Sequence, residues 1–207
     1  MSFSEKTIVE YAAASTFLLI RIDMTASPNR DDLLARIRRY GSRFPERATV
    51  VERIAEFVLR DPRCAEREND VGHLTGSAWI VSKDRKRALL LHHRKLGRWI
   101  QLGGHADGEI DLLSVALKEA REESGLSQIR SVSHEIFDID IHEIPEWKDV
   151  SRHLHFDVRF LFEADEGEKL VVNEESHGLA WVELGDLESY TQEESVLRMG
   201  RLTRALE

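Results

Sequence analysis

The chain has 207 residues, of which 42% are hydrophobic and 32% are charged, and its formal net charge is −9. This composition supports a domain with a sizeable core and excludes a globally disordered chain. A strongly acidic protein is a poor binder of DNA, RNA or anionic membranes, so we expect neither nucleic acid nor membrane as a partner. The single cysteine, Cys64, excludes an intramolecular disulfide and favours a cytoplasmic location.

An apolar run near the N-terminus, residues 12–20 (AAASTFLLI), is too short to span a bilayer. A signal peptide is the alternative interpretation. However, Glu5 and Glu10 precede the run, and RIDM follows it where a small-residue cleavage site would lie. We therefore expect a buried helix or strand here.

The next segment is predicted to form two amphipathic helices. Pro28 breaks the chain, and Asn29 or Asp31 is a suitable N-cap for the first helix. Apolar residues then recur at helical spacing, with a glycine and a proline between the two helices. Residues 61–70 are polar and indicate a linker, so residues 1–70 are expected to form a mostly helical extension.

From residue 71 onwards the pattern changes to short strands separated by polar turns. Strands are expected at residues 73–82, 87–95, 98–104, 129–144, 152–164 and 178–184. One helix lies between the third and fourth strands, and a helix or pair of helices is expected at 185–206. Strands with an inserted helix and terminal helices indicate a mixed α/β domain (α+β, with a mixed sheet) over residues 71–207.

The inserted helix has clear predicted ends. Asp111 is a suitable N-cap, and Gly125 is well placed as the left-handed residue after the last turn. At helical spacing, one apolar stripe is expected to face the core. Its members are Leu112, Leu113, Ala116, Leu117 and Ala120.

Three carboxylates, Glu119, Glu122 and Glu123, lie at the margin of this stripe. Like charges three and four residues apart repel, so a solvated acidic face partly neutralised by Lys118 and Arg121 is one interpretation. The other is a metal site, since oxygen-only ligands favour Mg²⁺, Mn²⁺ or Ca²⁺. The glycine-rich loop GGHADGE before the helix supports the second, because glycines and a helix N-terminus allow a phosphate to approach closely.

The segment 104–126 resembles the signature of the Nudix hydrolases, G-x5-E-x7-R-E-U-x-E-E-x-G-U, where U is aliphatic. The matching residues after the first glycine are Glu119, Glu122, Glu123, Gly125 and Leu126. Three positions depart from the pattern. Ile110 replaces the first glutamate, with Glu109 one residue earlier, Lys118 replaces the arginine, and Ala120 replaces a larger aliphatic residue.

The resemblance implies a Nudix-like α/β/α sandwich that hydrolyses a nucleoside diphosphate linked to another group, with water attacking phosphorus. It also implies that Glu119, Glu122 and Glu123 hold Mg²⁺ (or Mn²⁺), with the carbonyl of Gly103 near a metal. A loop glutamate in NEES, taken as Glu175, is expected to complete the catalytic set, and either it or Glu119 could serve as general base. The resemblance does not cover the N-terminal helices, which could pack on the domain, shape its cleft or build a homodimer.

Two other functions compete with this one. A Nudix-fold binding or regulatory module without efficient turnover is favoured by the departures at Ile110 and Lys118, but a mere binder has no need of three mutually repelling acids. An isomerase of allylic diphosphates shares this fold and relies on a cysteine. Cys64 lies in a polar linker and matches no such motif.

Basic and aromatic residues suggest where a substrate binds. Arg94 and Arg98 precede the glycine loop and could grip phosphates, and His105 lies within that loop. Trp99 or Trp147 could stack on a base, although a core position is favoured for Trp99.

One strand carries polar side chains at alternate positions: His153, His155, Asp157 and Arg159 share a face. This face could line a wet substrate cleft, in which case His155, Asp157 and Arg159 would contact substrate, or it could simply face solvent. A zinc site formed by His153, His155 and Asp157 is disfavoured because the sequence shows no fourth ligand.

Overall fold

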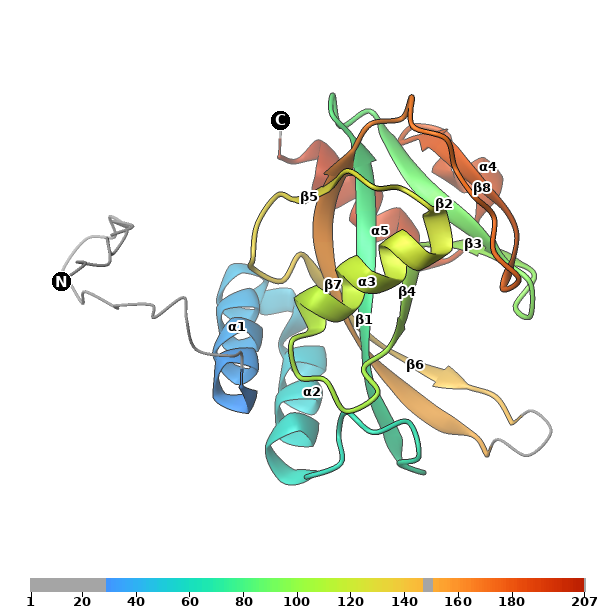
Figure 1. Ribbon diagram of the computed structural model, residues 1–207. Coiled ribbons are helices and arrows are strands. Elements are labelled where there is room, and N and C mark those ends of the chain that lie inside the picture. The colour runs from blue at the N-terminus through green and yellow to red at the C-terminus, as the bar shows by residue number, and fades with distance from the viewer. Residues whose placement is uncertain (1–28, 147–150, 207) are drawn as a thin grey trace, which may run out of the picture.

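The computed structural model describes residues 29–146 and 151–206. The apolar run at 12–20 and Trp147 lie outside these described residues. Figure 1 shows a twisted sheet with helices packed against it.

Two antiparallel helices precede the sheet, as predicted. They are α1 (Arg30–Arg43) and α2 (Ala48–Arg60), joined by the short 3₁₀ turn Pro45–Arg47. Asn29 is the N-cap of α1, and its side chain accepts hydrogen bonds from the backbone N–H groups of the first turn. Among the described residues, no helix combines the length and apolar character needed to cross a membrane.

Eight strands form one mixed sheet. In chain order they are β1 (Gly72–Ser82), β2 (Arg87–His93), β3 (Arg98–Ile100), β4 (Leu102–His105), β5 (Ile129–Ser131), β6 (Asp138–Ile144), β7 (His153–Ala164) and β8 (Ser176–Glu183). The central pair, β1 and β7, is parallel, and every other pairing is antiparallel. One edge of β1 pairs with β2 and β4, and one edge of β7 pairs with β5 and β6, while β2 also pairs with β3 and β8.

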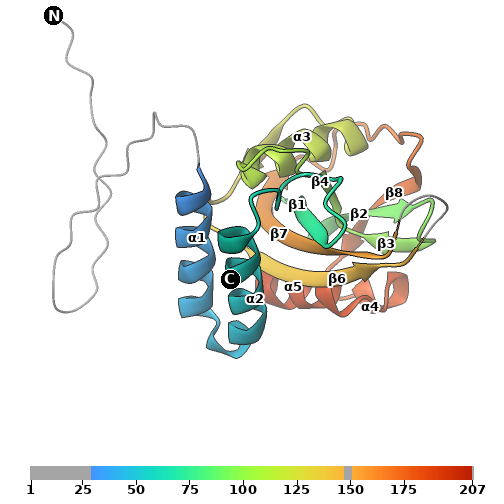
Figure 2. The same ribbon diagram turned by 90° about the horizontal axis from the view of Figure 1, so that it is seen from below.

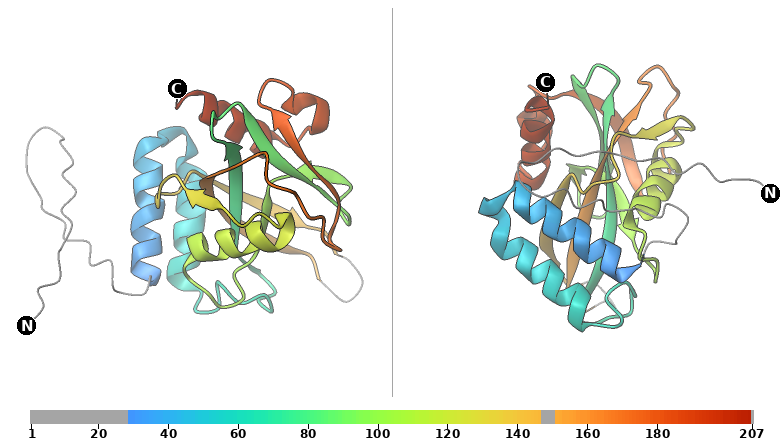
Figure 3. Two further views of the ribbon diagram at one scale, coloured as in Figure 1. Left: turned by 45° about the horizontal axis from the view of Figure 1, so that its top comes forward. Right: turned by 90° about the vertical axis from the view of Figure 1, so that its left-hand side faces the viewer.

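Helices cover both faces of the sheet. Figure 2 shows α3 (Leu112–Ser124) on one side and the C-terminal helices α4 (Leu187–Tyr190) and α5 (Glu194–Arg204) on the other, with α1 and α2 beside the sheet. The predicted α/β/α sandwich with a mixed sheet is therefore confirmed. Figure 3 shows the α1–α2 pair lying against the half of the sheet that contains β6 and β7.

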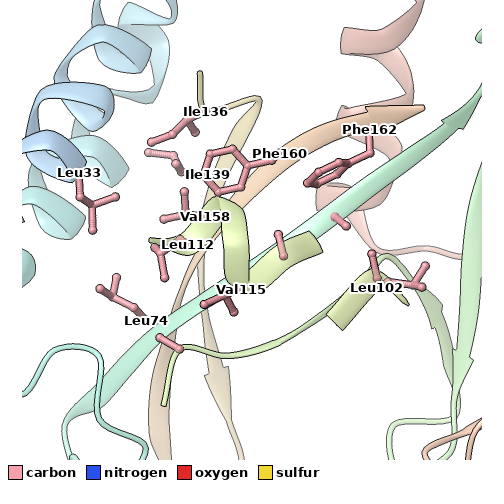
Figure 4. Close-up of a cluster of buried hydrophobic side chains, with 14 of the residues drawn as sticks. Leu33, Leu74, Leu102, Leu112, Val115, Ile136, Ile139, Val158, Phe160 and Phe162 are labelled. Atoms are coloured by element: carbon pink, nitrogen blue, oxygen red, sulfur yellow. The ribbon is translucent and has the colours of Figure 1, made fainter. Parts of the chain in front are cut away.

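Side chains along β1 and β7 point alternately to the two faces of the sheet, which divides the interior into two apolar clusters. The larger lies on the α3 side and contains Leu74 and Val158 together with Leu33 of α1, as Figure 4 shows. The smaller lies under α5 and contains Trp79, whose Nε1 donates to Thr203 Oγ1 at 2.8 Å. Because α1 and α2 share the larger cluster, they are part of the same core as the sheet.

Two segments that were predicted as single strands are each broken in the structure. The segment 98–104 is broken at Gln101, because β3 pairs with β2 whereas β4 pairs with β1. The segment 129–144 is broken at residues 132–137, because β5 and β6 pair with opposite ends of β7. The first break is a change of partner strand, and the second separates two segments that pair with the same strand; a periodic pattern reveals neither.

Candidate active site

Helix α3 begins and ends where the sequence predicts. The Asp111 side chain accepts a hydrogen bond from Ser114 Oγ at 2.6 Å, and Gly125 follows the last turn with φ 71°. The buried face is rotated relative to the predicted stripe, since Leu113 and Leu117 are only half-buried. The residues of α3 that are buried instead are Leu112, Val115, Ala116, Ala120, Glu123 and Ser124.

This rotation turns the three helix carboxylates toward the glycine loop to different depths. Glu123 is only 5% exposed, and its Oε2 accepts a hydrogen bond from the Gly103 N–H at 2.8 Å. Glu119 is half-buried beside Gly104, where an added Cβ would lie 2.5 Å from the Glu119 carboxyl carbon. Glu122 is the outermost, with its side chain 58% exposed. Gly104 is thus the residue that lets Glu119 approach the loop.

The carboxylates carry negative charge that nearby cations do not fully offset. Burial and the charges of Glu119, Glu175 and Glu122 raise the pKa of Glu123 to about 8, although the Gly103 N–H opposes the shift. Burial likewise raises the pKa of Glu119, against the effect of Lys118. A divalent cation would relieve this repulsion, and the oxygen-only donor set fits Mg²⁺ or Mn²⁺.

Glu175 joins the helix carboxylates from a distant part of the chain. Its charge contributes to the raised pKa of both Glu119 and Glu123. The loop is held in place because the Arg94 N–H donates to the Glu175 carbonyl at 2.9 Å and the Arg94 Nη2 donates to the Ser176 carbonyl at 3.0 Å. Arg94 therefore anchors the loop that carries Glu175.

The departures from the motif have visible consequences. Ile110 packs against the large core cluster, and Glu109 accepts a hydrogen bond from the Asp111 N–H at 2.8 Å. Glu109 therefore supports the start of α3 instead of the helix carboxylates. Lys118 Nζ lies 3.4 Å from Glu119 Oε1 and 3.7 Å from Glu122 Oε2, on the exposed side of the helix.

Other predicted substrate contacts are engaged elsewhere. Arg98 forms an ion pair with Glu193 at 2.7 Å. Trp99 stacks on His92 with ring centroids 4.9 Å apart and is half-buried, consistent with a packing role. Cys64 is fully buried and burial raises the pKa of its thiol, which disfavours a nucleophilic role.

Asp157 and Arg159 lie in a buried ion network, each 1% exposed. Arg159 Nε donates to Asp157 Oδ2 at 2.7 Å, and its Nη1 donates to Asp138 Oδ2 at 3.0 Å. Arg198 from α5 also donates to both carboxylate oxygens of Asp138, and Tyr40 of α1 donates to the same group. The predicted contact of Asp157 and Arg159 with substrate therefore has no support from their placement. Instead, Arg159 ties β7 to Asp138 of β6, and Asp157 ties β7 to β1 by accepting hydrogen bonds from the Thr75 and Ser77 hydroxyls at 2.8 Å.

Histidines gather at the end of the same sheet face. His105 and His155, both predicted site residues, have ring centroids 5.1 Å apart, and His73 lies within 4.9 Å of each. Burial is the main cause that lowers the pKa of His73 and of His105 to about 4. Sequence reasoning missed His73, because it joins the group only through the parallel pairing that sets it opposite His155.

Comparisons with known proteins give one matching family and several similar solved structures. The model of the NUDIX domain family matches residues 73–206. Among solved structures, a NUDIX-family hydrolase from Clostridium perfringens is 23% identical, with a TM-score of 0.48 over 65% of this chain and 98% of that one. A MutT protein from Methanosarcina mazei Go1 is 18% identical (TM-score 0.50; 67% and 98% covered), and a C. elegans Ap4A hydrolase is 18% identical (0.48; 64% and 96%). No curated protein matches the sequence.

Proposed function

Because the chain belongs to the NUDIX domain family, we propose that it hydrolyses the diphosphate linkage of a nucleoside diphosphate joined to another group. The observation that carries this proposal is the meeting of Glu119, Glu122, Glu123 and Glu175 beside the glycine loop. Glu123 is buried and Glu119 half-buried, with the exposed acids Glu122 and Glu175 beside them. Such a group of acids needs a cation, and a diphosphate is the substrate whose own charge requires one as well.

In the proposed reaction, a water oxygen attacks one phosphorus, the bond from that phosphorus to the bridging oxygen breaks, and the bridging oxygen leaves with the other phosphate. Mg²⁺ or Mn²⁺, held by Glu119, Glu122, Glu123 and the carbonyl of Gly103, would supply Lewis-acid stabilisation of the charge that develops on phosphorus. The Gly103 N–H fixes the orientation of the Glu123 carboxylate before substrate arrives.

The attacking water must lose a proton, and we consider two residues as its acceptor. Glu119 is half-buried and lies against Gly104 of the glycine loop. Glu175 is exposed on a loop that Arg94 anchors. We propose Glu119 as the general base and Glu175 as a supporting member of the catalytic carboxylates. Arg94 and His105 remain proposed contacts for substrate phosphates.

A second candidate is a binding module that retains the fold with little turnover. Its support is specific: Ile110 has replaced the first motif glutamate and packs against the core, and Lys118 offers one point charge where the motif has the forked guanidinium of arginine. Tight binding of a nucleoside diphosphate without product formation would identify this function.

The test is a panel of nucleoside diphosphates linked to sugars, nucleosides and phosphates, assayed for product with Mg²⁺ and with EDTA. Hydrolysis that EDTA and Glu123→Gln both abolish supports the enzyme, and reaction in ¹⁸O-water should place one ¹⁸O on a phosphate product. The matched control is Glu109→Gln, an exposed acid of the same loop that should retain activity. Bound ligand without any product across the panel would reject hydrolysis.

A further inference from the structure

Five histidines from four strands meet at the end of the sheet face that also carries Asp157. They are His73 of β1, His105 of β4, His142 of β6, and His153 and His155 of β7. His73, His155 and His142 occupy one row, because β1 sets His73 opposite His155 and β6 sets His142 opposite the same residue. Figure 1 shows the ends of β1, β7 and β6 side by side at this point.

We propose that His73, His153 and His155 form a binding site for a transition-metal ion of the zinc type, separate from the carboxylate site. One ring nitrogen from each of the three lies within 4.8 Å of the others. In tetrahedral zinc sites the Zn–N bond is about 2.0 Å, so ligand nitrogens stand roughly 3.3 Å apart. The nitrogens would therefore have to approach one another by at most about 1.5 Å to reach that spacing.

The ring of His153 is held in the tautomer that a metal needs. Its Nδ1 lies 2.8 Å from the Ser151 carbonyl oxygen, which only accepts hydrogen bonds, so Nδ1 carries the proton. Nε2 is then left with its lone pair. A backbone carbonyl behind one ring nitrogen is the usual support of a metal-ligating histidine.

Unpartnered nitrogens give a second, independent indication. His73 is only 2% exposed, yet neither of its ring nitrogens has a hydrogen-bond partner, and the buried Nε2 of His155 has none. Buried polar atoms without partners are rare because each costs free energy. The ring centroids of His73 and His155 lie 4.8 Å apart with the planes tilted by 53°, so a shared ion would use nitrogen lone pairs that nothing else satisfies.

His105 is excluded from the ligand set although it is close. Arg67 Nη2 lies 2.8 Å from His105 Nδ1 and can only donate, so the proton of His105 is on Nε2. The nitrogen left for coordination is thus covered by a cation. With three ligands, the fourth position of a zinc ion would be open to water or to an oxygen of a bound compound.

The site differs from the carboxylate site in place and in chemistry. Gly103 lies opposite Ser77, four residues along β1 from His73, which is about 13 Å at the rise of a strand. Imidazole nitrogens select Zn²⁺, Cu²⁺ or Ni²⁺, whereas the carboxylates select Mg²⁺ or Mn²⁺. The two sites should therefore fill independently.

The test is calorimetric titration of the metal-free full chain with Zn²⁺ in the presence of millimolar Mg²⁺. Co²⁺ would then be bound in place of Zn²⁺, and its visible absorption would report a four-coordinate site. His153→Asn and His155→Gln should each weaken Zn²⁺ binding by at least about 100-fold, since loss of mere supporting residues already costs 10–100-fold. His153 is half-exposed, so its variant should fold even if a change at the buried His73 prevents folding.

Two controls define the site. His105→Gln and Glu123→Gln should leave Zn²⁺ affinity within about threefold of the original chain, because neither side chain is a ligand. No Zn²⁺ uptake by the original chain would overturn the proposal. Loss of uptake in Glu123→Gln but not in His153→Asn would place the ion at the carboxylates instead. Equal loss in His105→Gln and His153→Asn would overturn the three-ligand assignment.

Discussion

Replacing Glu123 with glutamine should make the metal-free protein more stable at alkaline pH while removing its activity. The Glu123 side chain is 5% exposed, and its pKa is raised from 4.5 to about 8. Between these values the folded chain keeps a proton that the unfolded chain releases, so the free energy of unfolding falls as pH rises through this window. Below pH 4.5 both states are protonated and the effect vanishes.

The size of this stability effect follows from the pKa shift of Glu123. One pKa unit corresponds to about 1.4 kcal/mol, so ionised Glu123 costs the metal-free fold on the order of 4 kcal/mol at pH 8. Glutamine cannot ionise, and its side-chain oxygen can still accept the hydrogen bond from the Gly103 N–H. The variant should therefore regain most of this free energy.

Urea unfolding in EDTA, followed by tryptophan fluorescence from pH 5 to 9, measures the effect. Glu123→Gln should be more stable than the original chain at pH 8 and should show a flatter dependence on pH. Added Mg²⁺ should stabilise the original chain but not the variant. Glu122→Gln, whose side chain is 58% exposed, is the matched control and should change metal-free stability by less than about 0.5 kcal/mol. A Glu123→Gln variant that is less stable at pH 8, or that keeps the original pH slope, would refute this reasoning.

Three further outcomes are expected. Gly104→Ala should lower kcat by about tenfold or more without unfolding the protein, because the new Cβ displaces the flexible Glu119 carboxyl. The control is Gly185→Ala, whose new Cβ meets open space. Glu119→Gln should lower kcat by about 100-fold or more, as expected for loss of a general base, and the loss should exceed that in Glu175→Gln. Comparable losses in the two variants would reject Glu119 as the base. Arg159→Leu should cost about 3–5 kcal/mol in chemical unfolding because it strands buried carboxylates, and a loss below 1 kcal/mol would contradict the network.

Local signals predicted much of the fold and part of the site. The ends of α3 at Asp111 and Gly125 follow from capping chemistry that lies within a few residues, and both predictions are confirmed. The depth of Glu123 could not be read from helical spacing, because neighbouring strands rotate the buried face. His73 was not predicted as a member of the histidine group for a related reason. Its neighbours come from strands far along the chain, and the register of parallel strands has no short-range signature in the sequence.

The central parallel pair has a consequence for how the protein is made. Gly72 at the start of β1 pairs opposite Leu154 in β7, and Ser82 at its end pairs opposite Ala164, so the middle of the sheet closes only after residue 164 has left the ribosome. Until then α2 lacks Phe156 of β7, on which its Phe57 stacks, and the larger apolar cluster that α1 and α2 share is incomplete. Such late, long-range closure slows folding. Nascent chains that stall before β7 is made should consequently be substrates for chaperones or proteolysis.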